Sequence, residues 1–238
     1  MQDIAMTMQL ATGDLTRLTT AIKELDPQPR ERRWTSLTFC ILDAVWSIQA
    51  NYKTTVVPLV ERVAATLDIS NPSVAASTVC IDPLPINRFL EEFDIIRLLE
   101  TTNKQRTSTR GGITKAQAVL EHGQALQKHG VETIDQAQLL FENPGHFRAV
   151  NADLRHIKGE GAHGIRRSYF WMLVGDHDRV KPDRMVLRWF KHHGHTFNPA
   201  EAAETIAVVV DRINSEVPAR KLTAWEVDHA LWKSGRDL

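Results

Sequence analysis

The sequence predicts an all-α protein, because apolar residues recur with helical spacing over most of the chain. With 238 residues, 42% of them hydrophobic, the chain can bury a substantial core. Two valine runs, Val56–Val57 and Val208–Val210, favour strands by composition, but their flanks are helical in pattern and neither has a partner hairpin. The expected helices are Leu15–Leu25, Trp34–Gln49, Val56–Leu67, Ile86–Leu99, Ile113–Lys128, Arg166–Val174, Arg184–Lys191, Ala200–Ile213 and Trp225–Trp232.

Several of these helices have recognisable start signals. Asn198-Pro199 and Thr223 precede two C-terminal helices, and Pro182 stands directly before Asp183 at the start of another. The sequence contains no internal repeat and no low-complexity tract. The expected breaks between helices are Asp26–Arg32, Ile69–Pro85, Thr101–Gly112 and Glu142–Gly145.

Composition argues against several classes of protein. No apolar run reaches the length of a membrane span, and the first ten residues lack the basic and apolar regions of a secretory signal, so we expect a cytoplasmic protein. The two cysteines, Cys40 and Cys80, are too few for a disulfide framework or a four-thiolate iron–sulfur cluster. The histidine-rich run 192–195 has no Cys or carboxylate close by, so no side-chain metal site is expected there.

The segment Leu154–Phe190 reads as a short helix, a two-glycine turn, a second helix and an aspartate that opens a third. Gly159 and Gly161 flank one residue, so the backbone can turn sharply and present N–H groups beside the next helix N-terminus. Residues 146–195 contain ten Lys or Arg but only five Asp or Glu, whereas the whole chain has 29 of each. The pattern favours a nucleic-acid backbone as partner. The alternative is a simple turn between packed helices, followed by a capping Asp.

This arrangement resembles the helix-hairpin-helix (HhH-GPD, endonuclease III-like) superfamily of DNA glycosylases. The family's signature is Leu-Pro-Gly-Val-Gly, a helix, and an aspartate at the start of a further helix. Ile157–Gly161 stands at the hairpin and Asp183 at the aspartate. Lys158 replaces the usual proline and Glu160 the usual apolar residue, so we expect the hairpin to hold phosphate differently. The resemblance covers most of residues 35–195.

The resemblance extends to the segment Ile41–Val63. Family members insert a glutamine at a helix end into the space left by a flipped-out nucleotide, and Gln49 matches that glutamine. The alternative for Gln49 is a plain helix-terminal polar residue. Trp46, Tyr52 and Lys181 are candidates for a pocket around the flipped base, with core packing as the alternative for the two aromatic residues.

The resemblance implies a DNA glycosylase that flips a damaged, mismatched or modified nucleotide and hydrolyses its N-glycosidic bond. Asp183 would stabilise the positive charge that develops on the sugar and orient the attacking water. Bifunctional members carry a lysine where this chain has His163, so a monofunctional enzyme is expected. The sequence does not identify the base that is removed. It also does not distinguish DNA repair from defence against foreign DNA. The residues expected to hold phosphate are Lys158, Gly159, Glu160, Gly161, Ala162 and His163.

The family fold implies one HhH-GPD-type unit over residues 1–238, made of two helical lobes beside a DNA-binding cleft. The approximate lobes are residues 45–150, and residues 1–44 together with 151–238. The expected partner is double-stranded DNA with a damaged or modified base, bound by a monomer. No organic cofactor is implied, and the resemblance allows a monovalent cation on the hairpin carbonyls.

Other interpretations stay open. A non-catalytic helix-hairpin-helix DNA-binding protein would explain the altered hairpin, and a glycosylase with lyase activity could use Lys158 or Lys181. Asp43 lies near a second catalytic acid of adenine-removing relatives, but the spacing is two residues off, which favours a structural or surface role. The polar loop Thr101–Gly112, with its three basic residues, could follow a DNA strand or simply be solvated.

Overall fold

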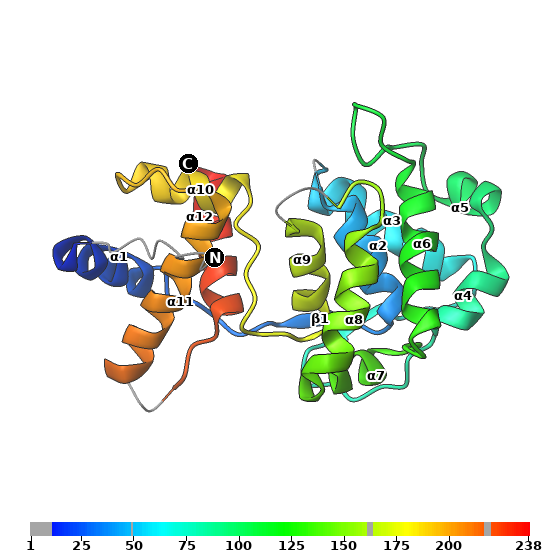
Figure 1. Ribbon diagram of the computed structural model, residues 1–238, viewed down its shortest axis with the longest axis horizontal. Coiled ribbons are helices and arrows are strands. Elements are labelled where there is room, and N and C mark those ends of the chain that lie inside the picture. Colours follow the sequence, from blue (N-terminus) through cyan, green and yellow to red (C-terminus); the bar gives the residue numbers. More distant parts are fainter. Residues whose placement is uncertain (1–10, 49, 161–163, 217–219) are drawn as a thin grey trace, which may run out of the picture. The chain divides into compact units, whose positions relative to one another are not determined.

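The computed structural model describes residues 11–48, 50–160, 164–216 and 220–238. These residues form twelve α-helices and one two-stranded sheet, so the expected helical character is confirmed (Figure 1). The chain divides into two compact units. Unit 2 is the continuous segment Arg30–Asp176, and unit 1 combines Met1–Pro29 with His177–Leu238. No helix within the described ranges is both long and apolar enough to cross a bilayer.

Unit 2 is built around α2 (Leu37–Trp46), whose ten residues are all buried. Helices α3, α4, α6 and α9 pack against it. A helix that is apolar on nearly every face needs neighbours on every side, which explains its central position. The other elements of unit 2 are β1 (Arg32–Trp34), the π-helix η1 (Tyr52–Val56), α3 (Val57–Ala65), β2 (Ser73–Ala75), α4 (Ile86–Glu92), α5 (Ile95–Thr101), α6 (Lys115–Lys128), α7 (Ile134–Leu139), the 3₁₀-helix η2 (Leu140–Glu142), α8 (Pro144–Arg155) and α9 (Ile165–Val174).

The small sheet was not expected. Strands β1 and β2 pair antiparallel, with Arg33 opposite Val74. The Arg32 guanidinium reinforces the pairing by donating to the backbone oxygen of Ser73 at 2.7 Å. Three-residue strands are too short to produce a clear alternating pattern, so no periodicity in the sequence indicates them. The valine runs are helical, as expected: Val57 lies in α3, and Val208–Val210 lies in α11 (Pro199–Glu216).

The expected helix Ile86–Leu99 is wrong in its extent, because the structure divides it into α4 and α5. Phe93 is extended, and the Asp94 carboxylate accepts a hydrogen bond from the Arg97 backbone N–H at 2.8 Å. Asp94 is therefore the N-cap of a new helix. Phe93 is nevertheless buried, so apolar spacing continues across the break and hides it.

Unit 1 contains α1 (Thr12–Glu24), α10 (Arg184–His192), α11 and α12 (Ala224–Asp237). Its core includes Leu18, Trp189, Phe190 and Ile206. Helices α10 and α12 approach closely at Gly235, where a Cβ atom would lie 2.1 Å from the Met185 carbonyl oxygen. Two expected start signals are confirmed: Asn198 accepts from the Ala200 and Glu201 N–H groups, and Thr223 forms a capping box with Glu226.

The boundaries between the two units differ from the boundaries expected for the lobes. The expected boundaries at 44/45 and 150/151 both lie inside unit 2. The first boundary would cut α2, which packs within unit 2, and the second would cut α8, which packs against α6 and α9 of that unit. The joining of N-terminal and C-terminal helices in one unit agrees with the expected arrangement. The DNA-binding cleft stays a prediction.

Candidate nucleic-acid interface

The turn after α8 depends on Gly159. Its φ angle is +96°, in the region that favours glycine, and an added Cβ atom would lie 2.3 Å from the Thr107 Cβ atom. The turn therefore packs directly against the loop Thr101–Gly112. Lys158 is exposed beside it. The hairpin residues Gly161, Ala162 and His163 lie outside the described residues.

Glu160 occupies the family's apolar position and is buried as an apolar residue would be, with its side chain 2% exposed. Its Oε1 atom lies 3.2 Å from His122 Nε2 on α6. Arg166 and Arg167, in the first turn of α9, lie 4.0 and 3.9 Å from its two carboxylate oxygens. The carboxylate thus faces the interior and joins the turn to α6 and α9. The altered residue type is explained by these polar partners.

The end of α2 is fixed by Lys115, a residue that sequence reasoning missed. Its ammonium donates to the carbonyl oxygens of Trp46 at 3.1 Å and Ile48 at 2.8 Å, and to Gln105 Oε1 at 3.1 Å. Burial and the nearby Arg166 charge lower the pKa of Lys115 to about 8. Gln49 itself lies outside the described residues. The only sequence signal was a lysine in the first turn of α6, where the helix dipole disfavours a cation.

Two of the expected pocket residues have structural partners in unit 2. Trp46 is fully buried, and its indole N–H donates to Asn103 Oδ1 at 3.1 Å, so it offers no face to an incoming base. Tyr52 is half-buried, and its hydroxyl donates to Asp43 Oδ2 at 3.1 Å. Burial and the Asp43 carboxylate raise the pKa of Tyr52, which keeps it a phenol. Tyr52 remains a candidate for contact with a base.

Asp43 is a buried organising residue of unit 2. Besides Tyr52, the Trp34 indole N–H donates to its Oδ2 atom at 2.7 Å. Its negative charge and a side-chain hydrogen bond also help to raise the pKa of Tyr169 on α9, after the larger effect of burial. The carboxylate therefore joins α2 to β1, η1 and α9. Of the structural and surface roles that its spacing favoured, the burial of Asp43 agrees with the structural one.

In unit 1, Asp183 is the N-cap of α10. Its carboxylate accepts hydrogen bonds from the Met185 and Val186 N–H groups at 2.8 and 3.4 Å. The side chain is half-buried, so the acid is not sealed in the core. A carboxylate in this place is held in one orientation by the helix and retains lone pairs for other contacts.

Asp228 on α12 contacts the segment that leads into Asp183. Its Oδ1 atom accepts from the Lys181 backbone N–H at 2.9 Å. Burial, followed by the nearby Asp183 charge, raises the pKa of Asp228 well above its ordinary value. Lys181, the third expected pocket residue, is itself buried. Sequence reasoning missed Asp228 because a lone Asp on an amphipathic helix gives no sign of its burial.

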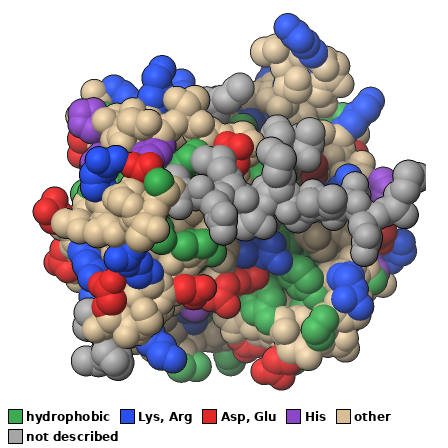
Figure 2. All heavy atoms as spheres, turned by 60° about the vertical axis from the view of Figure 1, so that its left-hand side comes forward, with side chains coloured by type: hydrophobic (Ala, Val, Ile, Leu, Met, Phe, Trp, Pro, Cys, Tyr) green, Lys and Arg blue, Asp and Glu red, His purple; other side chains and the backbone are tan. Residues whose placement is uncertain are grey.

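The exposed face of α10 is cationic. Arg184, Arg188 and Lys191 are one helical turn apart and all exposed, while Val186, Trp189 and Phe190 are buried on the opposite side. The spacing matches the helical repeat, and α10 contains no acidic residue. Figure 2 shows Lys and Arg side chains mixed with Asp and Glu over one face of the molecule. The cationic side chains of α10 are suited to phosphate contacts.

The remaining basic and histidine-rich segments are weaker candidates for a nucleic-acid or metal site. In the loop Thr101–Gly112, Arg106 donates to the Gly112 carbonyl oxygen, while Lys104 and Arg110 are exposed. The His193 ring stacks on Trp189 with centroids 3.9 Å apart. Within the described residues, no group of three or more His, Cys, Asp or Glu side chains could hold a metal ion.

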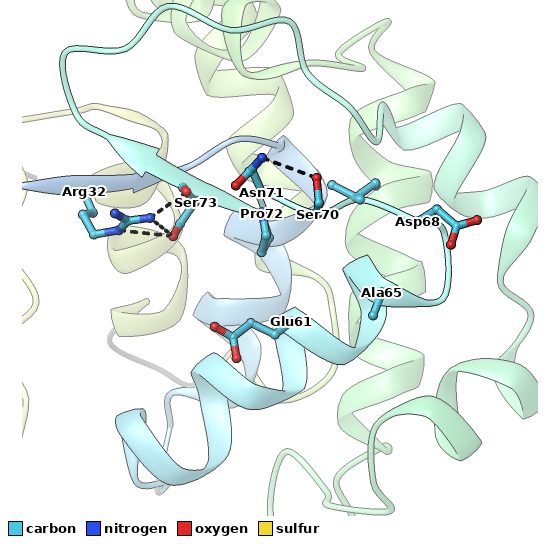
Figure 3. Close-up of a pocket in the computed structure, with 9 residues that line it drawn as sticks. Arg32, Glu61, Ala65, Asp68, Ser70, Asn71, Pro72 and Ser73 are labelled. Carbon is cyan, nitrogen blue, oxygen red and sulfur yellow. Dashed lines mark hydrogen bonds between the residues drawn. The ribbon is translucent and has the colours of Figure 1, made fainter.

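A shallow cavity of about 600 Å³ lies in unit 2 between α3 and the segment before β2 (Figure 3). Glu61 and Asp68 border it, and Arg32 at its edge is engaged with Ser73. Its two acidic side chains disfavour a phosphate ligand. The cavity is therefore a weaker candidate for a nucleic-acid contact than the turn at Gly159 or the face of α10.

Comparison with known proteins assigns a family. A model of the family described as Domain of unknown function (DUF8548) matches residues 14–236, and the chain therefore belongs to that family. No curated protein matches the chain, and no solved structure matches it.

Proposed function

We propose that this DUF8548 protein is a monofunctional DNA glycosylase, which flips a damaged, mismatched or modified nucleotide and hydrolyses its N-glycosidic bond. The observation that carries the proposal is Asp183. Its half-buried carboxylate is oriented at the N-terminus of α10, downstream of two helices joined at a glycine-dependent turn. A fixed carboxylate can stabilise an oxocarbenium-like transition state without reorganising.

Other described residues support DNA binding. Exposed Lys158 at the turn and the cationic face of α10 suit phosphate oxygens, which position a duplex without reading its sequence. Lys115 holds the two carbonyl groups on the N-terminal side of Gln49, so this ammonium would fix the backbone from which Gln49 enters the duplex. Tyr52, which is only half-buried, would contact the flipped base.

The proposal also covers the substrate, the compartment and the cofactor requirement of the enzyme. The substrate is double-stranded DNA, bound by a monomer in the cytoplasm, and hydrolysis needs no organic cofactor. A monovalent cation on the hairpin carbonyls is compatible with this chemistry. The nucleophile is water, because His163 stands where bifunctional relatives carry a lysine.

A second candidate function is DNA binding without catalysis. The observation that favours it is the use of the Asp183 carboxylate as a helix cap, since the same contacts serve a purely structural residue. The burial of Trp46 also removes one wall of the expected base pocket.

One experiment separates the two functions. The protein is incubated with a panel of duplexes that carry oxidised, alkylated, deaminated, mispaired or hypermodified bases, and released bases are identified by mass spectrometry. Release of a free base that requires Asp183 supports the glycosylase. Tight binding of these duplexes with no base released from any of them would favour the non-catalytic function.

A further inference from the structure

A small pocket with apolar walls lies in unit 1 beside the cationic face of α10. Its volume is about 280 Å³, and its apolar walls are Leu187 of α10 and Phe197 in the segment that leads into α11. Leu187 is half-buried, whereas Phe197 is 7% exposed. The Phe197 ring packs edge-on against Phe190 with centroids 5.0 Å apart, and His195 stacks on it at 5.4 Å. The core of unit 1 therefore holds the apolar part of this α10 pocket in place.

Three cationic side chains border the α10 pocket. Arg184, Arg188 and Lys191 all line it, and all three are exposed. None of the three side chains is held in an ion pair within the described part of the chain. The sixth lining residue is Thr196, so no acidic side chain lines the pocket. The three positive charges are therefore available to the negative charges of a partner.

The size of the pocket and its apolar walls narrow the choice of ligand. Phosphate oxygens contact guanidinium groups without needing apolar surface, so a DNA backbone leaves the walls formed by Leu187 and Phe197 unused. Small-molecule sites usually enclose about 300–1,000 Å³, and this pocket lies at the lower limit of that range. One large apolar side chain fits it better than a whole small molecule does. Protein interfaces commonly combine such an apolar anchor with arginine contacts.

We propose that the α10 pocket binds an acidic segment of a partner protein. One aromatic or leucine side chain of that segment would pack on Leu187 and Phe197, and its carboxylates would meet the three cationic side chains. An exposed ion pair is worth less than about tenfold in affinity. Covering one large apolar side chain is worth roughly ten- to a hundredfold. Binding therefore needs both features, and the inference goes beyond base excision and does not rest on it.

Fluorescence anisotropy with synthetic peptides tests the pocket. The probe is a short labelled peptide in which one phenylalanine is flanked by aspartates, and the full-length protein is titrated into it. Replacing the phenylalanine with serine should weaken binding by at least about tenfold, because the apolar anchor is lost. Replacing the aspartates with asparagines should weaken binding and remove its dependence on salt. Equal binding of the phenylalanine and serine peptides would overturn the proposal.

Charge reversal in the protein locates the binding site. Arg188→Glu changes one exposed cation of the pocket and leaves its apolar walls in place, so affinity for the phenylalanine peptide should fall by about tenfold or more. Lys233→Glu reverses an exposed charge on α12 outside the pocket and should keep the wild-type affinity. Lys191→Glu replaces Arg188→Glu if that variant does not fold. Equal losses in the pocket variant and in Lys233→Glu would indicate general charge attraction and overturn the proposal.

Two other occupants are tested with the same variants. A labelled undamaged duplex replaces the peptide, and sedimentation measures self-association of the protein. Duplex binding that requires Arg188, without phenylalanine-dependent peptide binding, would overturn the proposal and assign this face to DNA. Self-association that is lost in Arg188→Glu, again without peptide binding, would assign the pocket to a second copy of the chain. Peptide binding needs no DNA, so an inactive protein that binds the phenylalanine peptide through Arg188 would refute the glycosylase and keep this inference.

Discussion

The ammonium nitrogen of Lys115 lies 2.8 Å from the carbonyl oxygen of Ile48, and this contact ties the start of α6 to the end of α2. The carbonyl oxygens at a helix C-terminus are partly negative and lack helical partners. A single buried lysine thus satisfies groups that would otherwise be exposed to an apolar interior. Its position beside the segment that leads to Gln49 makes it relevant to function as well as to folding.

The pH dependence of stability should report on Lys115. Burial lowers its pKa to about 8 in the folded protein, against an ordinary value of 10.5. Between these values the unfolded chain binds more protons than the folded one, so the Lys115 contribution to the free energy of unfolding rises with pH. We expect the stability difference between wild type and Lys115→Met to shift in favour of wild type from pH 8 to pH 10.

Chemical denaturation at the two pH values measures this difference. Lys53→Met, which removes an exposed lysine from η1, is the control and should show no such change. A Lys115→Met difference that is independent of pH would mean that the amine titrates normally in the folded protein.

Asp183→Asn should reduce base release by at least about a hundredfold while DNA binding is retained, because a charge that stabilises the transition state is lost. Stability should change by less than about 0.5 kcal/mol, since Asn is also a good N-cap. Asp94→Asn makes the same chemical change at the N-cap of α5 and should leave turnover unchanged. Single-turnover base release and equilibrium binding measure the two effects. Near-wild-type release by Asp183→Asn would return this residue to a capping role.

The product of the reaction should be an intact strand with an abasic site. His163 stands where bifunctional relatives carry a lysine, and an imidazole does not form the stable iminium that an amine forms. Borohydride should therefore trap no covalent enzyme–DNA adduct, and the product strand should break only after treatment with alkali. An adduct that disappears in Lys158→Ala or Lys181→Ala would instead identify a lyase.

Gly159→Ala should destabilise the protein more than Gly130→Ala, by about 1 kcal/mol or more. Both glycines have positive φ, but an added Cβ atom meets the Thr107 side chain at Gly159 and nothing within 4 Å at Gly130. Thr107→Gly should relieve the clash, so the effects of Gly159→Ala and Thr107→Gly should be non-additive. Denaturant unfolding of the single and double variants tests this. Strict additivity would mean that the turn at Gly159 and the loop at Thr107 are not in packing contact.

Asp228→Asn should gain more stability over wild type at neutral pH than at acid pH. Burial raises the pKa of Asp228 in the folded state, so its penalty grows as pH rises above the ordinary value of 3.8. The asparagine keeps an oxygen for the Lys181 N–H and carries no charge. Asp153→Asn should behave oppositely, because hydrogen bonds from Lys128 and His129 lower the pKa of that carboxyl. Denaturation at pH 4 and pH 7 measures both variants, and equal behaviour would refute the assignment.

The sequence predicts the helices better than the site, for a physical reason. Apolar spacing and capping residues are local features of the sequence. Asn198, Thr223 and Asp183 therefore indicate where the helices that follow them begin. The burial of Lys115 and Glu160 depends on partners that are distant in sequence, namely the end of α2 and His122. No periodicity in the first turn of α6 or in the hairpin indicates which polar side chain turns inward.

The discontinuity of unit 1 sets an order of events during synthesis. Unit 2 is one uninterrupted segment, so all of its strands and helices have left the ribosome once Asp176 emerges. Helix α1 is made before unit 2, yet Leu18 and Ile22 pack in a core that otherwise comes from Val180 onwards. The apolar face of α1 therefore has no packing partner from unit 1 until the whole of unit 2 has been translated. Helix α1 is therefore synthesised before unit 2 but can pack with its partners only after unit 2 has been translated, and in that interval its apolar face is one that a chaperone would bind.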